Sequence, residues 1–379
     1  MTGQPVPMGR FLAYFLRLGT LGFGGPIALA GAMHRDLVEA RGWISEADYQ
    51  EGLTLAQVSP GPLAAQLAIY LGYVRAGILG ANLVGLAFIL PSFLMVLGLA
   101  ALYLRFGGLP WMQAVFYGVG AAVIGLITRS AVKLAKSTLK RDPLAWGIFA
   151  VVGLATTITG KEWVLLVVGG GLLFWVVRTR PWKHASAALG LMPPFWLTGL
   201  HGPAALTTVG GIFLFFAKAG LFVFGSGLAI VPFLRGTVVT ELHWLTERQF
   251  LDAVAVAMIT PGPVVITVAF IGHLVAGPLG AVAAALGVFL PVLGVVILAA
   301  PLMRRYGQRP GLKLLVQGIT AGAAGAIAGS VVVLGRGAIR DLPTALIAVS
   351  TLLLVWKTKI PEPLLVLAAA LAGGLLFHG

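Results

Sequence analysis

Apolar runs of about 20 residues recur along the whole chain, and they limit its fold more than any other feature does. A helix of about 20 apolar residues crosses the roughly 30 Å hydrocarbon layer of a membrane. Of the 379 residues, 59% are hydrophobic and only 10% are charged, whereas soluble domains carry about 25% charged residues. The sequence therefore predicts an all-α polytopic membrane protein, because helices satisfy their own backbone hydrogen bonds in lipid.

The charge balance is strongly basic. The chain has 26 Lys and Arg against 12 Asp and Glu, a formal net charge of +14. In a soluble protein this excess would suggest nucleic-acid binding. Here most cations flank apolar runs, where they set topology and meet anionic lipid. We therefore expect membrane lipid, and no nucleic acid, as their partner.

Several classes of chemistry lack their signatures. The chain has no cysteine, which excludes disulfides and thiol nucleophiles. Gly160-Lys161 is followed by Glu162 and forms no phosphate loop, and no His-Glu-x-x-His metal motif occurs. The first apolar run follows Arg10 and is longer than a signal-peptide core, so we expect it to stay in the protein. The sequence predicts no cofactor, no metal and no enzymatic activity.

An internal repeat divides the chain into two similar halves. At a shift of 201 the matching pairs are Phe23-Gly24-Gly25 with Phe224-Gly225-Ser226, Arg17 with Lys218, Gly19 with Gly220, Trp43 with Trp244, Glu46 with Glu247, and Ser59-Pro60-Gly61-Pro62 with Thr260-Pro261-Gly262-Pro263. At a shift of 200 they are Pro91 with Pro291, Gly118 with Gly318, Pro143 with Pro343, and Glu162 with Glu362. We expect homologous half-domains at 8–180 and 209–379, joined by a linker at 181–208.

Each half is expected to contain a similar series of helices. In the first half we place them near 10–32, 35–51, 52–74, 77–104, 110–135, 143–160 and 162–177. The pairs Ser45/Asp48 and Thr246/Gln249 have the spacing of helix N-caps. Gly118, Gly125, Gly318, Gly322 and Gly325 have the spacing of close helix packing, which also makes a homodimer plausible.

Basic residues predict that the two halves are inserted with opposite orientation. Residues 129–141 hold five Lys or Arg, whereas the equivalent segment keeps Arg336 and Arg340. Conversely, Arg105 is nearly alone, while its counterpart segment 304–313 holds four basic residues. Cytoplasmic loops are rich in Lys and Arg. If both rich segments are cytoplasmic, the halves form an inverted-topology repeat, as in many secondary transporters.

Glycine and proline interrupt the apolar runs at symmetry-related positions. These breaks comprise Gly24, Gly25, Pro26, Pro60, Gly61 and Pro62 in the first half, and Gly225, Ser226, Gly227, Pro261, Gly262 and Pro263 in the second. Backbone groups freed by such breaks are tolerated in a membrane only where protein or water satisfies them. Each break either starts a half-helix whose N-terminus faces an anion or is a simple proline kink. The paired arrangement favours an anion site.

Polar side chains near the breaks are candidates for substrate binding. Arg17 and Lys218 are equivalent cations within apolar runs, and they either neutralise an oxyanion or snorkel to the interface. Ser59 and Thr260 precede the prolines, and their hydroxyls either bind an oxyanion or bond a released carbonyl. The remaining candidates, which follow the Pro-Gly-Pro breaks, are Gln66 and Thr267.

Three titratable residues are candidates for coupling to a proton or another ion. Glu51 and Asp252 are equivalent carboxylates at the membrane edge, where they either titrate with transport or belong to solvated faces. His273 lies within the second half, and its charge can change near neutral pH.

The motifs resemble those of the chromate ion transporters. In the first half the similar segments are Phe23-Gly24-Gly25-Pro26, Trp43-Ile44-Ser45-Glu46, Pro60-Gly61-Pro62, Gln66-Leu67-Ala68, Gly72-Tyr73 and Ala76-Gly77. In the second half they are Phe224-Gly225-Ser226-Gly227, Trp244-Leu245-Thr246-Glu247, Thr260-Pro261-Gly262-Pro263, Phe270-Ile271-Gly272 and Ala276-Gly277. The resemblance covers nearly the whole chain.

This resemblance implies a function. It implies gradient-driven chromate efflux across the inner membrane, conferring chromate resistance, with sulfate as a look-alike substrate. Family members often carry Asn and a hydroxyl residue after the first Pro-Gly-Pro, where this chain has Leu63 and Ala64. The first-half site would then depend on backbone donors, Gln66 and Arg17, and another oxyanion is an alternative substrate. A scaffold or a channel is an alternative of a different class.

Overall fold

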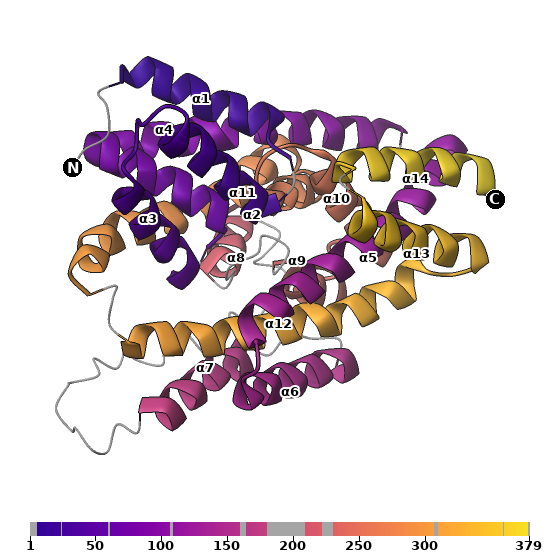
Figure 1. The fold of residues 1–379 in the computed structure, drawn as a ribbon. Coiled ribbons are helices and arrows are strands. Elements are labelled where there is room, and N and C mark those ends of the chain that lie inside the picture. The colour runs from indigo at the N-terminus through magenta and orange to yellow at the C-terminus, as the bar shows by residue number, and fades with distance from the viewer. Residues whose placement is uncertain are drawn as a thin grey trace.

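The computed structural model describes residues 6–23, 25–59, 61–106, 109–159, 164–179, 209–221, 230–306, 310–358 and 360–377 (Figure 1). Within these ranges the protein is helical and contains no strand. Among the predicted break residues, Gly24, Pro60 and Gly225-Ser226-Gly227 lie outside them, as does the predicted linker.

The first half contains seven α-helices and one short π-helix within the described residues. They are α1 (Met8–Leu21), α2 (Gly25–Met33), η1 (His34–Glu39), α3 (Glu46–Val58), α4 (Leu63–Phe106), α5 (Pro110–Leu139), α6 (Pro143–Thr159) and α7 (Val164–Thr179). The second half repeats the series as α8 (Val209–Leu221), α9 (Ile230–Arg235), η5 (Gly236–Glu241), α10 (Glu247–Ile259), η6 (Val264–Ile266), α11 (Thr267–Tyr306), α12 (Pro310–Ala338), α13 (Leu342–Lys357) and α14 (Glu362–Leu376).

The predicted helix breaks are confirmed where the structure describes them. Helix α1 ends at Leu21 and α2 begins at Gly25, while α3 ends at Val58 and α4 begins at Leu63. In the second half α10 ends at Ile259, before Pro261. The polar segment expected as a separate helix at 35–51 is instead divided between η1 and the first turns of α3.

The start of α3 and that of α10 follow from the predicted caps. The backbone N–H of Asp48 donates to Ser45 Oγ at 3.1 Å, and that of Gln249 donates to Thr246 Oγ1 at 3.2 Å. These side chains satisfy N–H groups that have no partner within the helix. The equivalent helices of the two halves therefore begin in the same way.

Helices α4 and α11 each fold back on themselves at an Ala-Gly pair. Gly77 and Gly277 have φ of 59° and 64°, a left-handed conformation that glycine adopts readily. A Cβ atom on Gly72 would collide with the carbonyl of Gly80 across the turn. Each long helix is therefore a tight hairpin with two limbs, close to the boundary predicted between residues 74 and 77.

The two halves exchange their last helices. Helix α5 of the first half packs on α13 and α14 of the second, and α12 packs on α6 and α7 of the first. Glycines make this close approach possible: a Cβ atom on Gly118 would collide with the Ala369 carbonyl, and one on Gly325 with the Phe149 carbonyl. Because these glycines pack inside the chain, their spacing does not support the expected homodimer.

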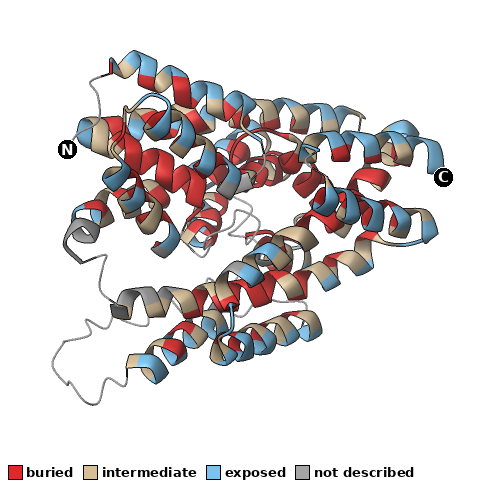
Figure 2. Cartoon of the chain, viewed as in Figure 1, coloured by how far each residue is buried: buried red, intermediate tan, exposed pale blue. Residues whose placement is uncertain are grey.

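The outer surface is apolar, as a membrane protein requires. By length and composition, four helical stretches among the described residues are candidate membrane spans: Leu63–Phe106, Pro110–Lys136, Val264–Pro301 and Gln317–Ala338. The first and the third of them contain the hairpin turns at Gly77 and Gly277. Large side chains such as Leu79, Leu298 and Leu371 are about two-thirds or more exposed, at 66%, 72% and 73%. Figure 2 shows exposed residues on the outer faces of helices whose inner faces are buried. The chain is a multi-pass membrane protein.

Candidate functional site

A cavity of about 1030 Å³ lies where the helix breaks of the two halves meet. The first-half break contributes Gly22, Phe23 and Pro26, and the second-half break contributes Thr260 and Gly262. Leu63 and Val264, which begin α4 and η6, also line it. N-termini of helices carry partial positive charge and free N–H groups, so these ends favour an anion.

One backbone hydrogen bond joins the two breaks directly. The N–H of Gly262 donates to the carbonyl of Gly22 at 2.8 Å. Gly262 has a φ of 98°, and a Cβ atom there would collide with the Ser92 hydroxyl. Gly61 has the equivalent position, with a φ of 137°, and a Cβ atom there would lie 3.1 Å from Val292 Cγ2. Ser92 and Val292 are repeat equivalents, but the nearest atom to a Cβ on Gly61 would be Gln66 Nε2 of the same half, at 2.6 Å.

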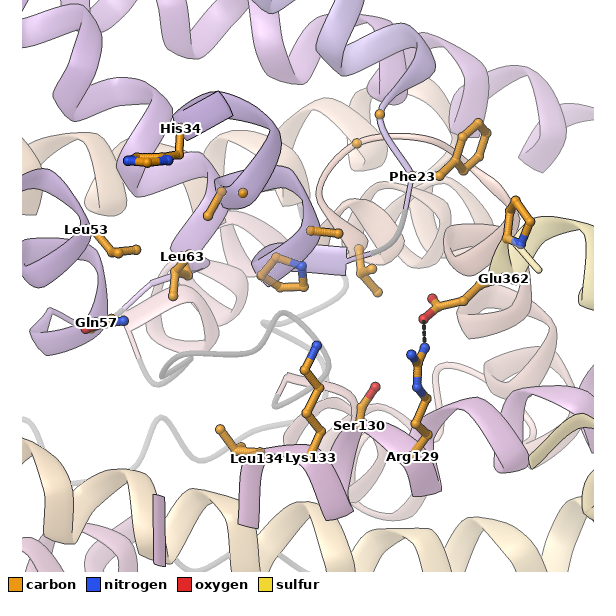
Figure 3. Close-up of a pocket in the computed structure, with 18 of the residues that line it drawn as sticks. Phe23, His34, Leu53, Gln57, Leu63, Arg129, Ser130, Lys133, Leu134 and Glu362 are labelled. Atoms are coloured by element: carbon orange, nitrogen blue, oxygen red, sulfur yellow. Dashed lines mark hydrogen bonds and ion pairs between the residues drawn. The ribbon is translucent and has the colours of Figure 1, made fainter. Parts of the chain in front are cut away.

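Cations outnumber carboxylates among the charged residues that line the cavity. Arg129 and Lys133 come from α5, and Arg35 comes from η1, while the carboxylates are Glu39 and Glu362. Figure 3 shows Arg129, Ser130 and Lys133 extending from α5 into the cavity. The other polar residues that line it include His34, Tyr49, Gln50, Gln57, Ser130, Thr138, Gln317, Thr320 and Thr358.

Arg129 pairs with Glu362 across the two halves. Its Nη1 lies 3.0 Å from Glu362 Oε1, and the side chains keep 34% and 23% of their surface exposed. Glu362 begins α14, where a carboxylate also interacts with the helix dipole. Arg129 therefore lines the cavity while Nη1 of its guanidinium is paired with the Glu362 carboxylate.

Arg129 and Lys133 were not among the site residues predicted from the sequence, where they belonged to the basic segment 129–141 used to assign topology. In the structure α5 continues to Leu139, and both residues lie on its cavity side. Their spacing of four residues was a usable signal, since residues four apart share one face of a helix. Ser130 and Leu134, one residue further along, lie on the same face.

The structure divides the predicted binding residues into two groups. Pro26, Thr260 and Gly262 line the cavity. Ser59, Gly61, Pro62, Gln66, Pro261, Pro263 and Thr267 are described nearby, but they are not among the residues that line it. The hydroxyl of Thr260 donates to the Val256 carbonyl at 2.7 Å, and that of Thr267 to the Val264 carbonyl at 2.8 Å. Both hydroxyls therefore donate to backbone carbonyls of the preceding turn, and the Val256 carbonyl also accepts the N–H of Thr260.

The two predicted cations lie away from the cavity. Arg17 on α1 and Lys218 on α8 are exposed, and neither lines it. Gly25 begins α2 beside the cavity-lining Pro26.

The predicted coupling residues also lie outside the cavity. Asp252 on α10 is buried, and its Oδ2 accepts a hydrogen bond of 2.7 Å from the Tyr103 hydroxyl of the other half. His273 is buried within α11, and Glu51 is half-buried on α3. Asp252 instead lines a second, much smaller pocket of about 70 Å³, together with Arg248, Tyr117 and Arg340.

The small pocket occupies positions equivalent to part of the large cavity. Tyr117, Gly120 and Ala338 line the small pocket, and their equivalents 200 residues away line the cavity. Those equivalents are Gln317, Thr320 and Thr138. At a shift of 201, Leu251 of the small pocket likewise corresponds to Gln50 of the cavity. The two spaces thus share repeat-equivalent lining positions and differ in volume, at about 1030 Å³ and about 70 Å³.

Broken helices that meet at a cationic cavity between two repeated halves define the class of protein: a multi-pass membrane transporter. The chain belongs to the chromate transporter family, which matches residues 9–175 and 210–374. The two matched segments suggest a two-half repeat.

Relatives match the chain over nearly its whole length. It is 56% identical to the chromate transport protein of Cupriavidus metallidurans over 376 residues, 98% of this chain and 94% of that protein. It is 56% identical to the probable chromate transport protein of Synechococcus elongatus over 371 residues, 95% of this chain and 93% of that protein. It is 33% identical to the chromate transport protein of Pseudomonas aeruginosa, over 98% and 94% of the two chains. No solved structure matches the chain.

Proposed function

We propose that the protein is a secondary carrier that exports chromate across the inner membrane. The observation that carries this proposal is the pair of repeat-equivalent spaces, one of about 1030 Å³ and one of about 70 Å³. A carrier alternates between states that are open on opposite sides, and inverted repeats achieve this by exchanging their conformations. A channel would not need two equivalent spaces that differ so much in volume.

The chemistry of the cavity fits a tetrahedral dianion. Three cations, Arg35, Arg129 and Lys133, face a space also bordered by helix N-termini. The planar guanidinium of Arg129 can bind two oxygens of an oxyanion at once, whereas Lys133 acts as a point charge. Chromate is the substrate because the relatives above are chromate transport proteins. Sulfate has the same shape and charge, so it is the competitor to test.

Arg129 and Glu362 give the carrier a way to sense its substrate. Their ion pair at 3.0 Å connects α5 of one half to α14 of the other. A dianion that binds Arg129 competes with the Glu362 carboxylate and so weakens this link between the halves. Substrate binding would therefore favour the change of conformation, because the ligand interacts differently with the two states.

The test is uptake of radiolabelled chromate into proteoliposomes that contain the purified protein and no ATP. We expect saturable uptake, inhibition by excess sulfate, and counterflow when the vesicles are preloaded with unlabelled chromate. Everted inner-membrane vesicles should accumulate chromate if the direction is efflux. Uptake no faster than in protein-free liposomes, with folded protein present, would refute the proposal.

A further inference from the structure

Three titratable side chains form a linked cluster on the wall of the cavity. His34 Nδ1 lies 3.1 Å from Glu39 Oε1, and His34 Nε2 lies 2.8 Å from Glu46 Oε2. His34 and Glu39 stand at the two ends of η1 and line the cavity, while Glu46 begins α3. We call these three residues the His34 cluster.

The charge of the His34 cluster depends on one proton. The contact of His34 with Glu46 is a hydrogen bond, whereas the contact with Glu39 is a close approach of Nδ1 to the carboxylate without hydrogen-bond geometry. A neutral ring therefore keeps only the hydrogen bond to Glu46. An imidazolium would form an ion pair with both carboxylates, because each lies within about 3 Å of a ring nitrogen.

In the second half, the position equivalent to His34 holds a residue that is charged without titrating near neutral pH. Arg235 is the repeat equivalent of His34, and its Nε lies 2.7 Å from Glu247, the equivalent of Glu46. Arginine is charged at every physiological pH. The two halves thus share one ion pair between the π-helix region and the following helix, but only the first-half pair depends on a proton.

The surroundings of His34 allow it to exchange a proton with water. The side chain keeps 27% of its surface exposed, and Glu39 and Glu46 keep 59% and 56%. Hydrogen bonds from Gln50 and His34 lower the pKa of Glu46, which favours its ionised form as the partner of the ring. Other charged or titratable groups lie nearby. The ring of Tyr49 on α3 packs edge-on against His34, with 4.7 Å between the ring centroids. Arg35 and Asp36 of η1 pair with each other, and Arg129 and Lys133 of α5 line the same cavity.

We propose that the His34 cluster is the proton-binding site of the carrier and that it couples chromate binding to proton binding. This inference rests on the proposed function. Protonation adds one positive charge to the wall that already holds Arg35, so proton and dianion each strengthen the binding of the other. By linkage the effect is reciprocal, and couplings of this kind change affinity by about 5- to 150-fold.

The test compares wild type with His34→Arg, which gives the first half the permanent cation of the second. Initial rates of chromate uptake into proteoliposomes are measured at about pH 5.5 and about pH 8, the range in which histidine changes charge. Chromate itself takes up a proton in this range, but that effect is common to both proteins. We expect the KM of wild type to rise between these pH values at least about fivefold more than the KM of His34→Arg. A pH dye inside the vesicles should report more proton movement per chromate in wild type.

Two further variants test the proposal in case His34→Arg does not fold. Glu39→Gln removes one of the two carboxylates with which an imidazolium pairs, so the pH dependence should fall towards that of His34→Arg. Arg235→Lys keeps a permanent charge and should retain the pH dependence of wild type. Equal pH dependence in wild type, His34→Arg and Glu39→Gln would overturn the proton site while chromate transport stands. A wild type that moves no chromate at any pH would overturn the proposed function and the coupling with it.

Discussion

The amide of Gly262 donates a hydrogen bond of 2.8 Å to the carbonyl of Gly22, and so joins the broken helices of one half to those of the other at the edge of the cavity. Neither group can be satisfied by its own helix, because both lie at breaks. The site therefore depends on the assembly of the two halves, and either half alone would leave polar backbone groups without these partners.

Gly262→Ala should destabilise the protein more than Gly77→Ala. Both glycines have positive φ, which costs an alanine roughly 1–2 kcal/mol. At Gly77 a Cβ atom meets nothing within 4 Å, whereas at Gly262 it would also collide with Ser92. The midpoint of thermal unfolding in detergent should fall for both variants, and further for Gly262→Ala.

The matched control for these glycines is Gly147→Ala. Gly147 lies in α6 with an ordinary helical φ, and a Cβ atom there also meets nothing within 4 Å. Alanine should be neutral or slightly stabilising at this position. Equal losses at Gly262 and Gly77 would show that the contact with Ser92 can relax, and would contradict the prediction.

Arg129→Gln and Glu362→Gln should change the KM for chromate in opposite directions. Removing the guanidinium removes charge-assisted hydrogen bonds to the anion, each worth about 1.5–3 kcal/mol, so KM should rise at least about tenfold. Removing the Glu362 carboxylate frees Arg129 from its ion pair at 3.0 Å, so KM should fall. Initial rates of uptake over a range of chromate concentrations measure both changes.

The control for these two variants is Arg178→Gln. Arg178 also pairs with a carboxylate, at 2.5 Å from Asp142, but neither residue lines the cavity. Loss of this pair should leave KM close to that of wild type. If Arg178→Gln and Arg129→Gln raised KM equally, the effect would come from general disturbance of the protein and not from anion binding.

Helix breaks were predictable from the sequence, because glycine and proline act locally. Pro62 lacks the backbone N–H of a helical hydrogen bond and Gly61 has a φ of 137°, and α3 and α4 end and begin on either side of them. The Ala76-Gly77 turn lies at the boundary between the helices expected at 52–74 and 77–104, although no hairpin was expected there. Such features depend on the dihedral preferences of a few neighbouring residues.

The exchange of helices between halves was not predictable in the same way. Gly118 and Gly373 are 255 positions apart in the sequence, and many apolar helices of this chain could have offered α5 a comparable surface. Arg129 was taken only as a marker of topology, because its partner Glu362 is distant in the sequence and comes from the other half. The cavity charges became clear only once the packing of α5 against α14 was known.

Two tyrosine hydroxyls should hold the small pocket closed. The Tyr117 hydroxyl donates to Asp341 at 2.7 Å, and the Tyr103 hydroxyl donates to Asp252 at 2.7 Å, each from the first half to the second. In the double variant Tyr103→Phe/Tyr117→Phe, the state with this pocket open should become at least about tenfold more populated, because each lost bond to a carboxylate is worth about 1.5–3 kcal/mol.

A single introduced cysteine can measure this change of population. The chain has no cysteine, and Gly120 lines the small pocket, so Gly120→Cys gives a unique label site. Its rate of reaction with a water-soluble maleimide should increase in the double variant. Tyr49→Phe is the control, because the Tyr49 hydroxyl donates to the Ala30 carbonyl beside the large cavity, and it should not speed labelling. An unchanged rate in the double variant would mean that these hydrogen bonds do not control access.

The ends of α5 and α12 should lie on opposite sides of the membrane. Lys140 follows α5 and Arg340 follows α12, and these exposed residues are repeat equivalents at a shift of 200. In an inverted repeat, equivalent points have opposite orientation, and the greater number of basic residues near Lys140 predicts that its side is cytoplasmic. Lys140→Cys and Arg340→Cys can be labelled singly in intact cells with a maleimide that does not cross membranes. Arg340→Cys should react from outside and Lys140→Cys only after permeabilisation. Reaction of both from one side would require the halves to be parallel. It would then remove the basis for exchange between the large cavity and the small pocket.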